Sequence, residues 1–399
     1  MTNDEIGCPA IRFAYYSDDW ALLRLGDVAN TVTSGSRDWA KYYSDYGDKF
    51  IRMTNLSRGG IHLLLDDLRF VKLDKDNSEG KRTSLIAYDI LISITAELGK
   101  IGLIPENFGT AYINQHTALV RLDHQRVDAR FVAYKLSSKK MNNNINRLND
   151  SGAKAGLNLP TIRSFPIRMP SLPEQQKIAD FLAAVDTRIE QLMQKKALLE
   201  EYKKGVMQQL FTQSIRFKDE QGEVFVEDWI TMKFGEVFRI SAGGDIDKDR
   251  FSQNQTPEHP YPVFANADKN DGLYGYASYS KEEGGCITVS GRGNLGTPHA
   301  RHAAFVPIVR LLVLRPRFPI DVDFFEAAIS RTNFFVESTG VPQLTGPQIG
   351  GYAVSFPSPE EQAKIANFLI AIDKKIETIT TQITETQAFK RGLLQQMFV

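Results

Sequence analysis

The sequence has little of what marks a secreted, membrane-embedded or disulfide-stabilised protein. Its 399 residues include only two cysteines, Cys8 and Cys286, which are too few for a disulfide framework. No segment approaches the roughly 20 consecutive apolar residues that a membrane-spanning helix needs, and residues 1–13 lack the apolar core of a signal peptide. We therefore expect a protein of a reducing cytoplasm.

A surplus of charge of one sign is absent as well, because 48 Lys and Arg residues balance 48 Asp and Glu residues. This balance argues mildly against nucleic acid as a partner. The distribution is uneven: residues 20–170 hold 22 basic and 15 acidic residues, whereas residues 229–357 hold 12 and 13. A basic first half is compatible with a surface that faces phosphates, and the second half gives no such indication.

Catalytic motifs are missing or incomplete. The chain has no Gly-x-Ser-x-Gly elbow, no Walker-type phosphate loop and no Pro-Pro pair of the kind that amino-methyltransferases use. Residues 291–296 match the dinucleotide pattern Gly-x-Gly-x-x-Gly, but a strand-like run follows Thr297-Pro298-His299 where the pattern needs a helix. The pattern favours a glycine turn that presents N–H groups and Arg292 to a phosphate or a base edge.

Two further groups of residues resemble metal-binding sets, but the sequence around them does not predict the strand or helix that such sites need. Asp67 with Glu79 and Lys81 resembles the Asp…Glu-x-Lys set of metal-dependent nucleases, but residues 76–80 have the composition of a turn. His299 and His302 lack a helical setting, and no Cys/His pair supplies further ligands. We predict no catalytic residue and no metal site in this chain.

The sequence does contain a long amphipathic helix pattern at residues 171–211. This stretch has no proline after Pro173 and a single glycine, Gly205. Steps of three, four and seven residues mark one apolar seam, which is formed by Ile178, Phe181, Val185, Ile189, Leu192, Leu199 and Val206. Ser171 and Glu174 have the spacing of a capping box, in which the glutamate reaches back to the serine N–H.

Residues 170–211 recur 187 residues later, at residues 357–398, without a gap. Ser358 and Glu361 repeat the cap, and Pro359 takes the first helical position. The identical pairs include Glu174/Glu361, Lys177/Lys364, Asp186/Asp373, Glu190/Glu377 and Gly205/Gly392. Shared polar residues at fixed positions along a whole helix indicate a true internal duplication.

The duplication also includes the entry to each globular segment. Ile-Arg-Phe followed by Asp-Trp occurs at residues 11–20 and again at residues 215–229. We therefore expect five segments, which are a first globular domain with its lead-in (1–170), a first spacer helix (171–211), a linker (212–228), a second globular domain (229–357) and a second spacer helix (358–399). Short strand patterns near residues 50–53, 90–94, 118–122, 286–290 and 309–314, with helices near 128–140 and 323–332, predict an α+β fold.

This pattern resembles the DNA-specificity subunit of type I restriction–modification systems over nearly the whole chain. The Glu-Gln-x-x-Ile-Ala helix starts at residues 174–179 and 361–366 are its most specific mark. The resemblance implies two globular mixed α/β target recognition domains, separated by two long antiparallel coiled-coil helices, with a pseudo-twofold internal repeat. It also implies a bacterial or archaeal cytoplasmic protein.

The resemblance further implies a subunit that is not itself an enzyme and carries no cofactor. In that family each globule reads one half of a bipartite site in double-stranded DNA, and the helices set the spacing. The helices also dock two modification subunits, which bind S-adenosylmethionine and methylate adenine at N6. Two restriction subunits add translocation and cleavage, with ATP and Mg²⁺.

Candidate site residues follow from the polar clusters beside aromatics and from the helix starts, since arginine and asparagine are the usual readers of guanine and adenine. The candidate DNA contacts are Ser36, Arg37, Arg52, Thr54, Asn55, Asn114, Gln115, His116, Asn266, Tyr274, Tyr276, Arg292, Asn294, His299 and Arg301. The candidate spacer-helix and partner-subunit positions are Glu174, Gln175, Ile178, Phe181, Val185, Ile189, Glu361, Gln362, Ile365, Phe368, Ile372 and Ile376.

Two other function classes stay open on the sequence. One is a coiled-coil scaffold that assembles proteins without reading DNA, against which the basic surplus of residues 20–170 argues weakly. The other is a self-contained DNA-modifying enzyme, for which the sequence supplies no catalytic constellation.

Overall fold

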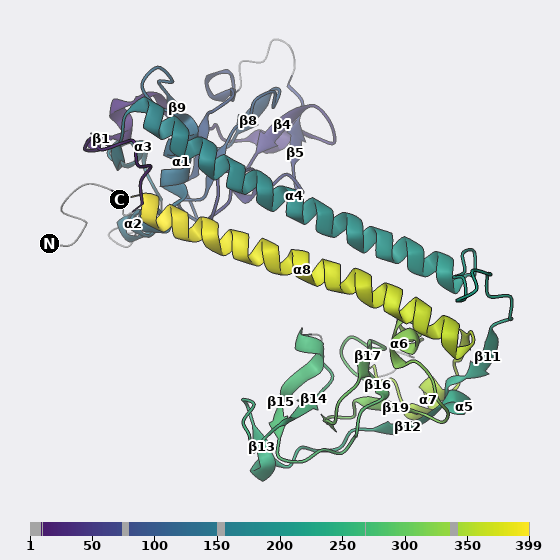
Figure 1. The fold of residues 1–399 in the computed structure, drawn as a ribbon. Helices are drawn as coiled ribbons and strands as arrows, with labels where there is room; N and C mark the ends of the chain where they lie inside the picture. Colours follow the sequence, from purple (N-terminus) through teal and green to yellow (C-terminus); the bar gives the residue numbers. More distant parts are fainter. Residues whose placement is uncertain are drawn as a thin grey trace. The chain divides into compact units, whose positions relative to one another are not determined.

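The computed structural model describes residue 9 and residues 11–73, 80–149, 156–267, 269–335 and 342–398. The chain divides into two compact units, of which the first combines Met1–Gln194 with Thr380–Val399 and the second is Lys195–Ile379. Both predicted long helices are present, as α4 (Leu172–Phe211) and α8 (Pro359–Met397). Each unit contains part of each helix, and within each unit the two helix segments run antiparallel (Figure 1). None of the helices in the described residues is long and apolar enough to cross a membrane.

The first unit builds two four-stranded sheets, of order β2-β9-β6-β7 and β3-β5-β4-β8, and a two-stranded sheet β1-β10. Its strands are β1 (Ala21–Arg24), β2 (Ala29–Ser34), β3 (Tyr43–Ser44), β4 (Asp48–Ile51), β5 (Arg69–Val71), β6 (Ile90–Ser93), β7 (Ile101–Leu103), β8 (Ala111–Ile113), β9 (Thr117–Leu122) and β10 (Pro166–Met169), and its shorter helices are α1 (Ala129–Ser137), α2 (Lys139–Asn149) and α3 (Leu159–Arg163).

The second unit builds sheets of order β12-β19-β16-β17 and β13-β15-β14-β18, and a two-stranded sheet β11-β20. Its strands are β11 (Ile230–Lys233), β12 (Phe238–Ala242), β13 (Phe251–Ser252), β14 (Tyr261–Phe264), β15 (Leu273–Ala277), β16 (Cys286–Val289), β17 (Pro298–Arg301), β18 (Val306–Pro307), β19 (Leu312–Pro316) and β20 (Ala353–Phe356), and its shorter helices are α5 (Phe234–Val237), α6 (Val322–Ser330) and α7 (Gly346–Gly350).

The two units therefore match strand by strand. The order β2-β9-β6-β7 corresponds to β12-β19-β16-β17, and each second sheet ends in one parallel pair, β4 with β8 and β14 with β18. The match extends to a close backbone approach beside that pair. A Cβ on Gly35 would lie 2.1 Å from the Ile113 carbonyl oxygen, and one on Gly243 would lie 2.6 Å from the Pro307 carbonyl carbon. Only glycine fits at both positions, so the duplication covers the globules as well as the helices.

One helix differs from the expectation. We predicted a single helix near 128–140 that ends in the asparagine-rich run, but α1 stops at Ser137 and α2 begins at Lys139 and contains that run. Ser138 has an extended backbone, which separates the two helices. Met141 and Ile145 are buried at i and i+4, so α2 has an apolar side that packs on the first unit despite its five asparagines.

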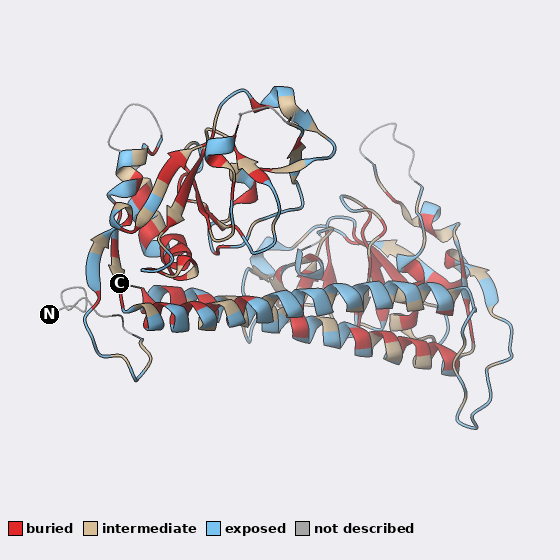
Figure 2. Cartoon of the chain, turned by 90° about the horizontal axis from the view of Figure 1, so that it is seen from above, coloured by how far each residue is buried: buried red, intermediate tan, exposed pale blue. Residues whose placement is uncertain are grey.

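Each core is completed by the beginning of one long helix and the end of the other. The first core includes Ile178 and Leu182 of α4 with Leu394 of α8, and the second includes Ile365 of α8 with Leu210 of α4. Aromatic ring contacts join each helix end to its globule, through Trp20, Phe131 and Phe398 in the first unit and Trp229, Phe324 and Phe211 in the second. Figure 2 shows the buried residues concentrated toward the ends of the helices, while their middle parts are largely exposed.

Candidate nucleic-acid interface and helix contacts

The glutamate at each helix start binds the arginine of the preceding lead-in. Both oxygens of Glu174 accept hydrogen bonds from Arg12, from Nε at 2.7 Å and from Nη2 at 2.8 Å. Glu361 accepts the same two bonds from Arg216, at 3.1 and 2.6 Å. Both glutamates are 1% exposed. The carboxylate that we expected to reach back to the serine N–H instead fixes the Ile-Arg-Phe segment, in the bidentate geometry that suits arginine.

The glutamine that follows joins each long helix to a helix of its globule. Gln175 Oε1 accepts from the Asp128 N–H at 3.0 Å, and its Nε2 donates to the Pro170 carbonyl at 2.9 Å. Asp128 is the N-cap of α1. Gln362 makes the same two bonds in the second unit, at 3.1 and 2.9 Å. Because the glutamines are 2% exposed, they stabilise the unit and offer no group to another subunit.

The apolar candidates on the helices are used inside the chain as well. Ile178, Val185, Ile365 and Ile372 are buried, and Phe181, Ile189 and Phe368 pack against the cores. A docking role for Glu174, Gln175, Glu361, Gln362 and these buried isoleucine and valine side chains is therefore withdrawn. Ile376 is half-buried. The misassignment arose because polar residues at a helix start are usually exposed, whereas here their partners come from distant segments.

The two long helices are joined by a reciprocal pair of ion pairs. Asp186 of α4 lies 2.5 Å from the Nζ of Lys390 of α8, and Asp373 of α8 lies 2.6 Å from the Nζ of Lys203 of α4. Asp186 and Asp373 occupy the same position of the repeat, and so do the two lysines. A contact in which residue i meets residue j and j meets i is the signature of twofold pairing, so the pseudo-twofold repeat that we predicted is confirmed.

The two ion pairs differ in burial and in the groups around the carboxylate, since Asp186 and Lys390 are buried while Asp373 is exposed. In the first unit Asp186 also accepts from the Tyr134 hydroxyl at 2.7 Å and lies 3.1 Å from His62 Nε2. Burial by itself would raise the pKa of Asp186, but the bonds from His62, Lys390 and Tyr134 outweigh it and lower that pKa. In the second unit α6 carries Ala327 at the position of Tyr134, and a cavity of about 260 Å³ lies beside it.

We predict that Tyr134→Phe lowers the free energy of unfolding by about 1–3 kcal/mol, because a buried carboxylate loses a donor. Ala327→Tyr is expected to raise it by about 1 kcal/mol, since the new ring fills the cavity near Asp373. Urea denaturation measures both changes. Tyr43→Phe, at an exposed side chain, is the control and should leave stability unchanged. Equal stability of Tyr134→Phe and the wild type would contradict this account of the ion pair.

Several predicted DNA contacts of the first unit lie together where two loops meet. Ser36 and Asn114 form a parallel bridge, and the Gln115 N–H donates to the Ser36 carbonyl at 3.0 Å. Ser36, Asn114, Gln115 and His116 are half-exposed, and Arg37 next to them is exposed. Thus five of the predicted residues form one polar patch beside the glycine approach at Gly35.

The remaining candidates of the first unit have a different role. Asn55 is 1% exposed, its Oδ1 accepts from the Arg52 N–H at 2.9 Å, and its Nδ2 donates to the Leu64 carbonyl at 2.7 Å. Asn55 therefore stabilises its own loop and has no free group for a base. The Arg52 guanidinium donates to Asp67 Oδ2 at 2.7 Å and lowers the pKa of that carboxyl. Only Thr54 of this group is exposed.

The Gly-x-Gly-x-x-Gly match is a turn that no helix follows, as predicted, and the structure shows that it is the loop of a β-hairpin between β16 and β17. Ser290 Oγ accepts from the Thr297 N–H at 3.0 Å and donates to the Asn294 carbonyl, while the Gly296 N–H donates to the Ser290 carbonyl at 2.8 Å. Gly296 has a φ of +83°, which requires glycine. We call residues 290–297 a serine loop.

The first unit contains the same serine loop at residues 93–100, between β6 and β7. Ser93 Oγ accepts from the Lys100 N–H at 2.8 Å and donates to the Glu97 carbonyl, and the Gly99 N–H donates to the Ser93 carbonyl at 3.0 Å. The recurrence of Ser-x4-Leu-Gly in the sequence was a signal of this loop that our sequence analysis missed.

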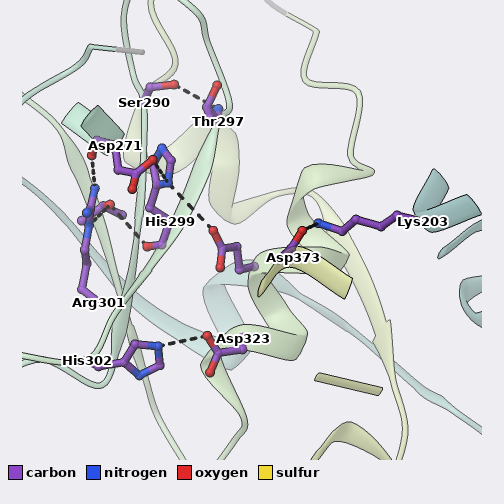
Figure 3. A network of polar contacts seen from close by, with 11 residues as sticks. Lys203, Asp271, Ser290, Thr297, His299, Arg301, His302, Asp323 and Asp373 are labelled. Carbon is purple, nitrogen blue, oxygen red and sulfur yellow. Dashed lines mark hydrogen bonds and ion pairs between the residues drawn. The ribbon is translucent and has the colours of Figure 1, made fainter. Parts of the chain in front are cut away.

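Arg301 and His299 of β17 turn toward other protein groups (Figure 3). Arg301 is 8% exposed, donates from Nε to Thr288 Oγ1 at 2.9 Å and from Nη2 to the Asp271 carbonyl at 2.6 Å, and lies over the Phe264 ring. Arg301 is thus a structural residue. His299 is half-buried, with its Nδ1 3.8 Å from an Asp271 carboxylate oxygen.

Asn266 links two loops of the second unit. Its Oδ1 accepts from the Gly291 N–H at 2.8 Å, and its Nδ2 donates to the Val309 carbonyl at 2.6 Å. Both ends of the amide are used, so Asn266 positions the loops. Arg292 donates to Gln343 at 3.1 Å and is half-buried.

Other candidates of the second unit are more open. Asn294 and Tyr274 are exposed and Tyr276 is half-exposed. Within the residues that the structure describes, no three His, Cys, Asp or Glu side chains are grouped to hold a metal ion. Glu79 of the nuclease-like set lies outside the described residues.

A family model for the type I restriction modification DNA specificity domain matches residues 17–201 and 226–387. The chain belongs to this family. Each match covers one globule and most of the helix that follows it, so the family domain is present twice, in agreement with the duplicated strand order.

Curated relatives and solved structures agree with the family. A putative type I specificity subunit of Mycoplasma pneumoniae is 26% identical, over 67% of this chain and 70% of its own. The putative type I restriction enzyme MjaX specificity subunit of Methanocaldococcus jannaschii is 22% identical, over 94% and 92%. The crystal structure of a type I restriction–modification S subunit from M. genitalium has a TM-score of 0.65 at 16% identity, over 98% and 99% of the two chains. A second structure, from work on assembly of the type I R-M system, has a TM-score of 0.55 at 17% identity, over 95% and 96%. The predicted fold class is confirmed.

Proposed function

We propose that each unit reads one half of a bipartite site in double-stranded DNA. The observation that carries this proposal is the serine loop, which has the same backbone bonds in both units but different side chains at its tip. Glu97 of the first loop and Asn294 of the second occupy the same position and are exposed. Thr95 and Arg292 also occupy equivalent positions in the two loops, and each contacts a neighbouring loop. Thr95 Oγ1 lies 2.8 Å from His116 Nδ1, and Arg292 donates to Gln343. A constant frame with different exposed groups is the arrangement expected of two readers with different base preferences.

We predict that replacing residues 229–357 with those of a homologue changes one half-site and leaves the other intact. The target is identified by sequencing methylated adenine in cells that express this chain with its modification subunits. The wild-type complex should then bind its own duplex more tightly than a scrambled duplex at the same salt concentration. A change in both half-sites would contradict modular reading, and equal binding to both duplexes would favour the scaffold alternative.

The long helices are proposed to set the distance between the half-sites. α4 contains 40 residues without a break, which corresponds to about 60 Å of helix. The reciprocal pairs Asp186–Lys390 and Lys203–Asp373 lock the register of α4 against α8 at two points. A helical segment of fixed length and phase is a suitable spacer, because it transmits both distance and rotation.

We predict that lengthening both helices changes the unspecified spacer of the target. One heptad inserted after Lys196 and another after Ile383 adds about 10 Å to each helix while keeping both Asp–Lys pairs. We expect the spacer to grow by about three base pairs. A heptad after Lys196 alone moves one pair out of register and is expected to lower stability. An unchanged spacer in the double variant would count against the proposal.

The partners of this chain are proposed to be two modification subunits, which supply S-adenosylmethionine-dependent adenine-N6 methylation, and two restriction subunits, which require ATP and Mg²⁺. This chain then contributes recognition and no catalytic residue. The structure supports a docking surface different from the one that the sequence suggested. Tyr202 of α4 and Phe389 of α8 occupy the same position of the repeat and are 52% and 54% exposed. Exposed aromatic rings at two equivalent points suit two copies of one partner.

We predict that Tyr202→Ala and Phe389→Ala each weaken binding of one modification subunit by at least tenfold without lowering the melting temperature, because neither ring is part of a core. Size-exclusion chromatography with light scattering should show one bound copy for each single variant and none for the double variant. Gln194→Ala and Thr381→Ala, exposed and equivalent in the repeat, are the matched controls. Two copies bound to the double variant would place the docking surface elsewhere.

A further inference from the structure

The turn between β18 and β19 has an unusual backbone. Val309 and Arg310 both have left-handed conformations, with φ of +52° and +61°, and the Leu311 N–H donates to the Ile308 carbonyl at 3.0 Å. Two successive residues of positive φ define a type I′ turn, which normally contains Asn or Gly. For a β-branched valine this conformation is strained.

Several contacts hold the strained turn in place. The Val309 N–H donates to the Gly244 carbonyl at 2.9 Å, and the Arg310 N–H donates to the Gly243 carbonyl at 3.0 Å. The side chain of Asn266 donates to the Val309 carbonyl at 2.6 Å and accepts from the serine loop. The turn is therefore fixed from both sides by groups of the second unit.

The strained conformation of this turn does not bury apolar side chains in the core. Val309 is 50% exposed and Arg310 is also exposed. The Arg310 side chain makes no hydrogen bond or ion pair with any residue of the described ranges. In the first unit the corresponding turn carries Gln115 and His116, neither of which has a positive φ. The shared fold thus does not require a left-handed backbone at this position.

We propose that Arg310 is a base-reading residue of the second unit. Its guanidinium would donate two hydrogen bonds to O6 and N7 of a guanine in the major groove, and Val309 would pack against the methyl group of a neighbouring thymine. Asn266 is then a positioning residue, since it acts through the turn and not on the base. The proposal rests on the proposed function, and it assigns one contact within it.

The test is a binding selection from a library of duplexes, in which each base pair of the target is varied in turn, with the complex of this chain and its modification subunits. Arg310→Ala is expected to reduce the preference for one G·C pair in a single half-site by at least tenfold. Arg310→Lys should lose the same preference while keeping most of the affinity, because lysine retains the charge but not the bidentate geometry. The other half-site should be unaffected.

Two further variants separate recognition from stability. Val309→Gly keeps the left-handed backbone without strain, so the melting temperature should not fall, while discrimination of the neighbouring T·A pair decreases. Asn266→Ala is expected to broaden the preference at the Arg310 base pair. Uniformly weaker binding of Arg310→Ala to all duplexes would make Arg310 a phosphate contact and overturn the proposal, as would unchanged binding. A wild-type complex without any sequence preference would instead refute the proposed function itself.

Discussion

Neither globular region of this chain can complete its core alone. Each requires the beginning of the long helix that follows it and the end of the other long helix, which adds a phenylalanine to the aromatic cluster around Trp20 or Trp229. Without these helix segments, apolar side chains of each core would be exposed to water, which costs free energy. This mutual dependence explains why residues 380–399 belong to the same compact unit as the first globule, although more than 180 residues separate the two segments in sequence. It also explains why the two helix starts are so similar, since Glu174 and Glu361 each bind the arginine of an Ile-Arg-Phe lead-in.

The sequence was sufficient for the long helices and the duplication, because both leave periodic or repeated residues at fixed offsets. The match between the globules was not visible, because their strands pair over long distances and the surface side chains differ. The serine loop shows where the limit lay. Ser93 and Ser290 are each followed by Leu-Gly at the same spacing. A pattern of seven residues is too short to indicate a shared loop until the structure shows the same hydrogen bonds in both copies.

The candidate site was predictable only in part, for a related physical reason. Residue type suggested base readers, and the patch of Ser36, Asn114 and His116 stays a prediction that the geometry supports. Asn55 and Arg301 are also residue types that can read bases, but their polar groups donate to neighbouring backbone carbonyls instead. Burial by distant segments cannot be read from a local pattern. Val309 and Arg310 were missed in turn, because a valine in an apolar run indicates a strand and not a left-handed turn.

The reciprocity of the helix contacts has a consequence for how such chains diversify. The Asp–Lys pairs, the lead-in arginines and the closing phenylalanines are the same residue types at equivalent positions in the two halves, whereas exposed loop residues at equivalent positions, such as Glu97 and Asn294, differ in type. Genetic recombination that exchanges one globule between related genes would therefore keep the Asp–Lys pairs and the Arg–Glu pairs of the shared frame. New recognition properties can arise in one event, without compensating changes elsewhere in the chain.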